Sequence, residues 1–156
     1  MFPPQFIAVD RIGNSLKIGS KKRLLEVLAE LLSSDHPSLD PETVFEHLLR
    51  RERLGSTGLG HGIALPHARM KEVTEALGAF VQLQEGVSFD AIDDKPVDLA
   101  FALLVPESAN EIHLQLLSQL ASMFSDAQLR QELRDASSAD QILQLLQSRG
   151  NDTADT

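Results

Sequence analysis

The sequence has no cysteine, a deficit of positive charge and no long apolar run. The lack of cysteine excludes disulfides, thiolate metal sites and cysteine nucleophiles. Lys and Arg number 14 against 23 Asp and Glu, so the formal net charge is −9, and nucleic acid is not an expected partner. No segment approaches the ~20 apolar residues of a spanning helix, and the N-terminus has no signal-peptide pattern. We therefore expect one cytoplasmic domain without membrane insertion.

Apolar spacing along the 156 residues predicts both helices and strands. Leucines at three- and four-residue steps indicate an amphipathic helix over about 20–32, and an Asp-Pro pair begins a second helix over about 40–53. Residues 78–84 are typical of a strand. The nearly continuous apolar run 97–105 predicts a central strand covered on both faces, and 110–124 predicts a third helix.

Shorter signals describe the segments in between. A strand or turn is expected at 16–18, and the Glu85-Gly86 turn predicts a hairpin to a short strand at 87–89. Ser125-x-x-Gln128 and Ser138-x-x-Gln141 have capping-box form and begin two more short helices.

The order of these elements predicts the fold class. Helices precede, interrupt and follow the strands, which indicates a single α/β domain with a mixed central sheet flanked by helices on both faces. We expect this domain over residues 1–148 and a disordered polar tail over 149–156.

The most distinctive segment, Gly55–Arg69, reads Gly-Ser-Thr-Gly-Leu-Gly-His-Gly-Ile-Ala-Leu-Pro-His-Ala-Arg. Its glycines let backbone N–H groups approach an anion, and its apolar run ends in Pro66 and His67. Neutral imidazole attacks phosphorus without prior deprotonation, so the segment suggests a phosphate cradle leading to a nucleophile. Alternatively, the glycines only form a tight connection. The phosphate-binding patterns of nucleotide sites are absent, so a nucleotide is disfavoured.

Histidine and arginine supply the candidate chemistry. His67 follows an apolar strand, where α/β sheets place ligand sites, although a lone histidine is more often a hydrogen-bonded core residue. His61, between two glycines, is read as an exposed loop residue. Zinc is not expected, because the His-Glu-x-x-His helix pattern is absent.

Other residues near the segment have two readings each. Arg51 and Arg69 are candidate phosphoryl clamps or solvated surface charges. Ser56 and Thr57 either donate hydroxyls to phosphate or shape the turn, and the N–H of Gly58 belongs to the same expected cradle. His113 shares a helical face with apolar residues, so it is either a core or rim residue or a catalytic partner.

The stretch Arg51–His67 resembles the active-site segment of the mannitol/fructose-type enzyme IIA domains of the bacterial phosphoenolpyruvate-dependent phosphotransferase system. A second stretch, Phe89–Pro106, is most similar to the nitrogen-regulatory (PtsN-type) branch. The resemblance covers about Ser15 to Leu146. Where many relatives have Pro-His-Gly-Lys, this chain has Pro66-His67-Ala68-Arg69.

This resemblance implies a phosphoryl carrier. His67 is expected to accept the phosphoryl group on Nε2 from an HPr-like carrier protein, with Arg51 and His113 as active-site partners and Ser56, Thr57, Gly58 and Arg69 around the phosphate. No cofactor is implied. Members of this branch regulate partners, here expected to be potassium transporters or sensor kinases, and Leu59, Leu65 and Met70 are expected to form the docking patch.

Two other functions fit the same residues. A sugar-specific enzyme IIA would pass the phosphoryl group to an enzyme IIB. A binding module would sense a small anion without covalent chemistry.

Overall fold

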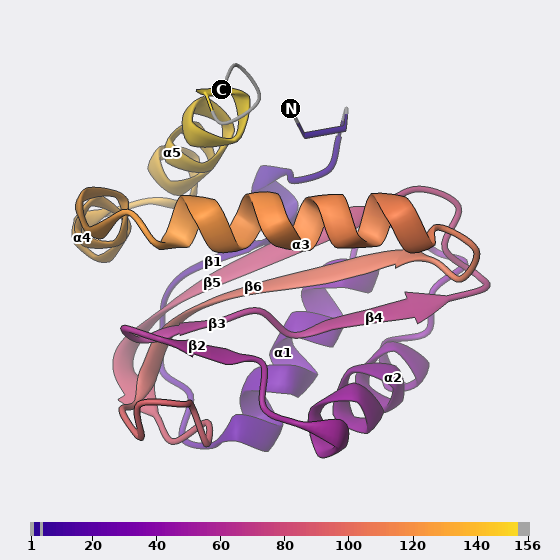
Figure 1. Cartoon of the computed structure of the whole chain (residues 1–156), viewed down its shortest axis with the longest axis horizontal. Coiled ribbons are helices and arrows are strands. Elements are labelled where there is room, and N and C mark those ends of the chain that lie inside the picture. Colours follow the sequence, from indigo (N-terminus) through magenta and orange to yellow (C-terminus); the bar gives the residue numbers. More distant parts are fainter. Residues whose placement is uncertain (1, 4, 153–156) are drawn as a thin grey trace.

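The computed structural model describes residues 2, 3 and 5–152, which fold into six strands and five α-helices (Figure 1). The strands are β1 (Ile12–Leu16), β2 (Gly58–Gly60), β3 (Ile63–Ala64), β4 (His67–Met70), β5 (Leu77–Val87) and β6 (Val97–Pro106). The helices are α1 (Lys21–Ser33), α2 (Pro41–Leu54), α3 (Asn110–Phe124), α4 (Ala127–Asp135) and α5 (Ala139–Asp152).

The strands form one mixed sheet, as the sequence predicts. The order is β1-β5-β6-β3-β2, and β4 also pairs with β6. Strand β6 is antiparallel to β5 and parallel to both β3 and β4. His67 begins β4 and lies opposite Leu103 of β6. The chain therefore follows β6 twice on the same side, first in β3 and then in β4, with Leu65 and Pro66 between them.

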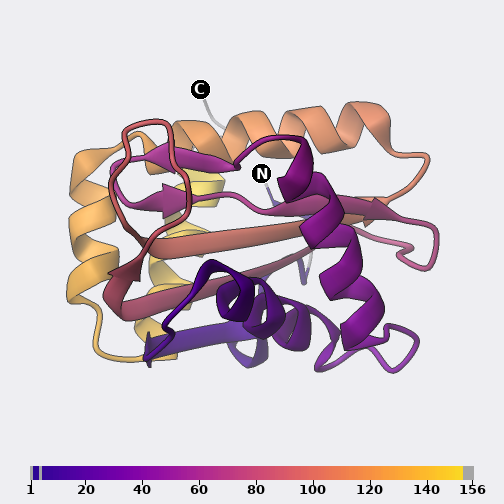
Figure 2. The ribbon, with the colours of Figure 1, turned by 90° about the horizontal axis from the view of Figure 1, so that it is seen from below.

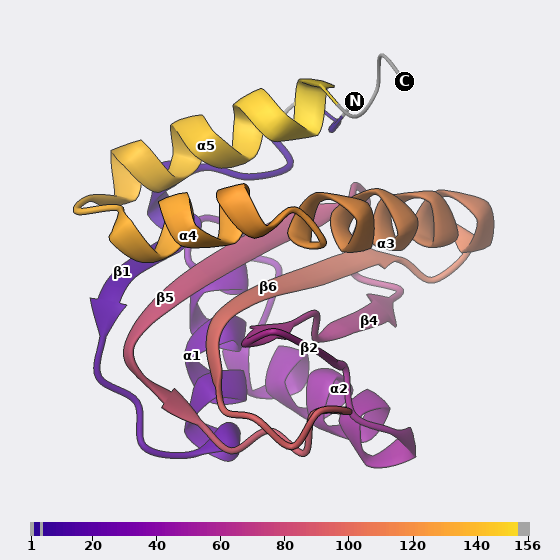
Figure 3. The ribbon, with the colours of Figure 1, turned by 60° about the vertical axis from the view of Figure 1, so that its left-hand side comes forward.

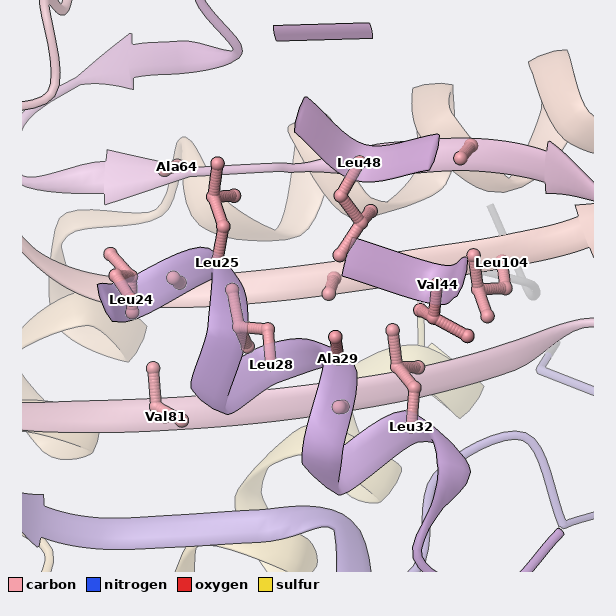
Figure 4. Close-up of a cluster of buried hydrophobic side chains, with 14 of the residues drawn as sticks. Leu24, Leu25, Leu28, Ala29, Leu32, Val44, Leu48, Ala64, Val81 and Leu104 are labelled. Atoms are coloured by element: carbon pink, nitrogen blue, oxygen red, sulfur yellow. The ribbon is translucent and has the colours of Figure 1, made fainter. Parts of the chain in front are cut away.

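Helices cover both faces of the sheet (Figures 2 and 3). Strand β6 shows why, because its alternate side chains enter two separate apolar clusters: Ala100, Ala102 and Leu104 face α1 and α2, whereas Leu99, Phe101 and Leu103 face α3, α4 and α5. Figure 4 shows leucines of α1 packed with Val44 and Leu48 of α2 in the first cluster. The predicted central strand is confirmed.

The first three helices begin and end close to their predicted bounds. Ser20 caps α1 by accepting a hydrogen bond from the Arg23 N–H, and Asp40 caps α2 by accepting one from Thr43, with Pro41 in the first turn. Helix α3 has the predicted limits. No helix in the described part of the chain is long and apolar enough to cross a membrane.

The predicted hairpin at Glu85-Gly86 is wrong. Strand β5 continues through these residues, and Val87 pairs with Val97 of β6, so the connection runs over 88–96 instead. A register shift between Gln82 and Val87 lets the strand bend without ending. The first strand also lies earlier than the predicted 16–18, over Ile12–Leu16.

The C-terminal helices need two further corrections. Asp126, not Ser125, caps α4, because its carboxylate accepts hydrogen bonds from Gln128 and Leu129 N–H groups. Helix α5 continues through residues 149–152 of the predicted tail. Arg149 stabilises this last turn, since it forms ion pairs with Asp126 of the α4 cap and Glu132 of α4. Residues 153–156, the rest of that tail, lie outside the described residues.

Candidate active site

A cleft of about 560 Å³ opens where α2, β4 and the first turn of α3 meet. These three elements lie together at one end of the sheet in Figure 1. None of the described residues that line the cleft is acidic, and six are histidine or arginine, so the cleft favours an anion. Its lining comprises His47, Arg50, Arg51, Leu54, His67, Ala68, Arg69, Asn110, His113 and Leu114.

Strand β4 contributes three consecutive residues, His67, Ala68 and Arg69, to the cleft lining, and its alternation separates their side chains. Ala68 and Met70 are buried in the cluster under α1 and α2, whereas His67 is half-buried and Arg69 exposed on the other side. Because β4 runs parallel to β6, and β6 leads directly into α3, the first turn of α3 returns beside His67.

The His67 ring is held by the backbone two residues before it. Its Nδ1 lies 2.8 Å from the Leu65 carbonyl oxygen. A carbonyl only accepts hydrogen bonds, so Nδ1 carries the proton and Nε2 keeps its lone pair. Pro66 has no N–H, and its own carbonyl accepts a hydrogen bond from the Leu103 N–H at 2.9 Å. The imidazole is therefore fixed with Nε2 as the free nitrogen.

The surroundings keep the rings of His67 and His113 neutral. Burial lowers the pKa of His67; the hydrogen bond to Leu65 opposes this, the Arg51 charge lowers the pKa further, and Glu52 raises it. Burial and the positive charges of His67, Arg69 and Arg51 lower the pKa of His113 to about 4. Both rings are thus neutral at pH 7, with one nitrogen protonated and the other carrying a lone pair, and the free nitrogen of His67 is available for nucleophilic attack.

Arg51, Arg69 and His113 join His67 in the cleft. The Arg51 guanidinium donates to the Gly55 carbonyl at 2.9 Å, at the end of α2, and Arg69 donates to the Asn110 side chain. The His113 ring stands edge-on to that of His67. The structure therefore gathers the expected nucleophile, both candidate clamps and the candidate partner histidine.

Ser56, Thr57 and Gly58 are not brought to this cleft. Thr57 is buried, and its hydroxyl and N–H both donate to the Glu52 carboxylate, at 2.6 and 2.9 Å. The Ser56 hydroxyl donates to the Phe89 carbonyl at 2.9 Å and accepts from the Gly58 N–H at 3.1 Å. These groups are committed to partners within the protein, so the expected glycine cradle around phosphate is not what they form.

The glycines build a two-stranded ribbon instead. Strand β2 pairs with β3, and the turn between them places Gly60, His61 and Gly62 at φ values of 91°, 57° and 81°, the left-handed region that glycine adopts without strain. The His61 N–H donates to Asp93, and its carbonyl accepts from Arg134. His61 is exposed at this turn, as the sequence suggests.

Sequence reasoning missed several cleft residues that helical spacing indicates. Positions 47, 50, 51 and 54 of α2 follow three- and four-residue steps, as do 110, 113 and 114 of α3, so each set shares one helix face. The missed residues are His47, Leu54, Asn110 and Leu114.

The expected docking patch needs correction. Leu65 and Met70 are buried, with 3% and 1% of their surfaces exposed, because both pack into the apolar clusters. Leu59 is 41% exposed. The apolar side chains at the cleft rim are Leu54 and Leu114, which are 83% and 69% exposed on opposite sides of it.

Comparison with known proteins assigns the family. Residues 5–149 match the model of the phosphoenolpyruvate-dependent sugar phosphotransferase system EIIA 2 family. The chain belongs to this family. Among its enzyme IIA relatives is a nitrogen regulatory protein of Pseudomonas aeruginosa, 48% identical over 128 residues, which are 82% of this chain and 83% of the relative.

Solved enzyme IIA structures agree with the fold. The crystal structure of nitrogen regulatory protein IIA-Ntr from Neisseria meningitidis superposes with a TM-score of 0.85 at 46% identity, covering 90% of this chain and 96% of that one. The Escherichia coli mannitol enzyme IIA, in its complex with phosphorylated mannitol enzyme IIB, gives 0.75 at 26% identity, covering 91% and 97%. The chain is therefore a phosphotransferase-system component of the nitrogen-regulatory IIA type.

Proposed function

We propose that this protein accepts a phosphoryl group on Nε2 of His67 from an HPr-like carrier and regulates partner proteins according to its phosphorylation state. The observation that carries the proposal is the Nδ1 hydrogen bond of His67 to Leu65, which leaves Nε2 unprotonated in a cationic cleft. Family membership supports the phosphoryl-carrier role, and the similarity to nitrogen regulatory proteins supports the regulatory one.

The transfer needs no proton to leave His67. The lone pair on Nε2 forms the new N–P bond, while the N–P bond of the donor phosphohistidine breaks and its electron pair returns to the donor imidazole. The proton stays on Nδ1 throughout, donated to the Leu65 carbonyl. The guanidinium groups of Arg51 and Arg69 stabilise the negative charge on the phosphoryl oxygens, and neutral His113 donates a hydrogen bond to one of them.

Regulation follows from the added charge. A phosphoryl group brings about −1.5 to −2 charge to the cleft and neutralises part of its positive field. The exposed side chains of Leu54 and Leu114 lie at the rim of the cleft. A partner that docks on this rim therefore meets a different charge in the phosphorylated and the unphosphorylated protein. We expect the partners to be potassium transporters or sensor kinases, as the resemblance to the nitrogen-regulatory branch implies.

The test is phosphorylation with phosphoenolpyruvate, enzyme I and an HPr-type carrier. The wild-type protein takes up acid-labile phosphate, and His67→Ala takes up none. His36→Ala is the matched control, because His36 is a partly exposed histidine whose Nδ1 pairs with Asp35 away from the cleft, and it keeps the label. Label on the His67→Ala variant contradicts the proposal.

The same assay separates the two other functions. Onward transfer of the phosphoryl group to an enzyme IIB indicates a sugar-specific enzyme IIA, the type of complex that the mannitol relative forms. Binding of inorganic phosphate without any labelling of His67 indicates an anion sensor.

A further inference from the structure

Glu52 is a buried carboxylate in the helix that supplies Arg51, yet it does not line the cleft. Only 2% of its side chain is exposed. Its Oε1 accepts a hydrogen bond from the Thr57 N–H at 2.9 Å, and its Oε2 accepts one from the Thr57 hydroxyl at 2.6 Å. Lys21 of α1 lies 3.0 Å from Oε1. Since a buried carboxylate is costly unless fully paired, this arrangement holds Thr57 firmly.

Thr57 is connected to His67 through a single residue, Leu65. Its carbonyl accepts a hydrogen bond from the Leu65 N–H at 3.0 Å. The carbonyl of the same Leu65 accepts the Nδ1 proton of His67 at 2.8 Å. A shift of Thr57 therefore moves the group that sets both the ring orientation and the tautomer of His67.

We infer that Glu52 is a positioning residue for phosphoryl transfer, which fixes the Nδ1-protonated tautomer of His67 through Thr57 and Leu65. Glu52 and Arg51 are adjacent on α2, with Glu52 buried and Arg51 in the cleft lining, so the same turn of the helix anchors Thr57 and supplies a cation to the cleft. This inference rests on the proposed function. It assigns Thr57, at the start of the glycine segment, to the support of His67.

A purely structural anchor would also be buried and paired, so the test must measure the ring itself. Long-range ¹H–¹⁵N correlation spectra of the unphosphorylated protein report which ring nitrogen of His67 carries the proton. The variants are Glu52→Ala, which removes both acceptors, and Thr57→Val, which keeps the shape but removes the hydroxyl. Thr57→Ser keeps the hydroxyl and the N–H, and is the rescue.

Ser33→Ala is the control for the loss of a buried hydrogen bond. The Ser33 hydroxyl donates to the Ala29 carbonyl within α1 at 2.7 Å, with no connection to His67. This variant and Thr57→Ser are expected to keep the wild-type tautomer and phosphorylation rate.

Both Glu52→Ala and Thr57→Val are expected to populate the Nε2-protonated tautomer and to lower the phosphorylation rate about tenfold to a hundredfold, as misplacement of a reacting group does. If Glu52→Ala does not fold, the His67 tautomer in Thr57→Val tests the inference alone. A wild-type tautomer in the folded variants overturns the inference, whether or not the rate falls. If the wild-type protein takes up no phosphate, the proposed function fails, and the tautomer measurement still decides the role of Glu52.

Discussion

The imidazole rings of His67 and His113 lie edge to face, with their centroids 5.2 Å apart and their planes at 84°. One ring begins β4 and the other lies in the first turn of α3, so residues 46 positions apart by number share one cleft. Two protonated rings at this distance would repel each other, which is part of why the pKa of His113 is lowered to about 4.

The first prediction concerns the pH dependence of phosphorylation. Protonated His67 has no lone pair on Nε2, and its pKa lies below the ordinary value of 6.5. The rate should therefore fall on acidification with a midpoint below pH 6.5 and level off at higher pH. Initial rates across pH 4.5–8, with the carrier kept fully phosphorylated, check this. A midpoint above 6.5 would contradict the assignment of a neutral, desolvated nucleophile.

The second prediction concerns stability below neutral pH. Because the pKa of His113 is lowered by folding, the unfolded chain binds more protons between pH 6.5 and about 4. Above pH 6.5, His113 is neutral in both states and does not lower the free energy of unfolding. As the pH falls from 6.5 to about 4, the free energy of unfolding decreases, because the unfolded chain is protonated first. His113→Gln should reduce the difference between urea midpoints at pH 7 and pH 4.5. An unchanged difference would show that His113 is not desolvated in the folded protein.

The third prediction concerns Arg51. Arg51→Met keeps the aliphatic stem and removes the charge, so we expect the transfer rate to fall about a hundredfold, as for loss of one preorganised charge-stabilising donor. The pKa values of His67 and His113 should rise, because the Arg51 charge lowers both. Arg53→Met is the control, since exposed Arg53 lies on α2 outside the cleft lining. Equal rates in the two variants would remove Arg51 from the site.

How much of this site the sequence predicts depends on the range of the contacts involved. Helix α2 is recognisable from its Asp-Pro start and its apolar spacing, so Arg51 is placed correctly from local pattern. The hydrogen-bond partners of Ser56 and Thr57 cannot be recognised from a local sequence pattern. Ser56 bonds to Phe89, 33 residues away, and Thr57 bonds to a carboxylate that only folding buries. Their polar side chains therefore look available in the sequence although they are committed in the fold.

The Glu85-Gly86 pair and the last turn of α5 are two places where the local sequence predicts the wrong structure. The Glu85-Gly86 pair has the composition of a turn, yet pairing of Val87 with Val97 extends β5 through it. The last turn of α5 looks like a polar tail, yet the ion pairs of Arg149 with α4 and its cap stabilise it. In both cases a tertiary contact outweighs the local preference.

The fourth prediction concerns Arg134, which connects α4 to the β2–β3 turn. Its guanidinium donates to both carboxylate oxygens of Asp98, at 2.9 and 3.0 Å, and to the His61 carbonyl at 2.6 Å. Arg134→Ala should lower the free energy of unfolding by about 1–2 kcal/mol, since the pair is partly exposed. Urea denaturation measures this against exposed Gln131→Ala. The phosphorylation rate should not change; a large loss of rate would contradict the separation of this turn from the cleft.

The fifth prediction concerns the apolar rim. Leu54→Asp should reduce the kcat/KM for transfer from the carrier about tenfold through weaker docking, because burial of an aliphatic side chain at an interface contributes about 1.5–3 kcal/mol. Stability should change little, since Leu54 is 83% exposed. Ile92→Asp is the matched control, because Ile92 is 86% exposed in the β5–β6 connection and does not line the cleft. Equal loss in both variants would place docking elsewhere.

Identification of the phosphorylated atom tests the proposed phosphoryl transfer to His67 most directly. Phosphorus-coupled ¹⁵N spectra of the protein, labelled in its histidine rings and phosphorylated by the carrier, resolve the two nitrogens of each ring. We expect a single N–P bond at Nε2 of His67, with the proton retained on Nδ1. A bond at Nδ1 of His67, or at either nitrogen of His113, would contradict it.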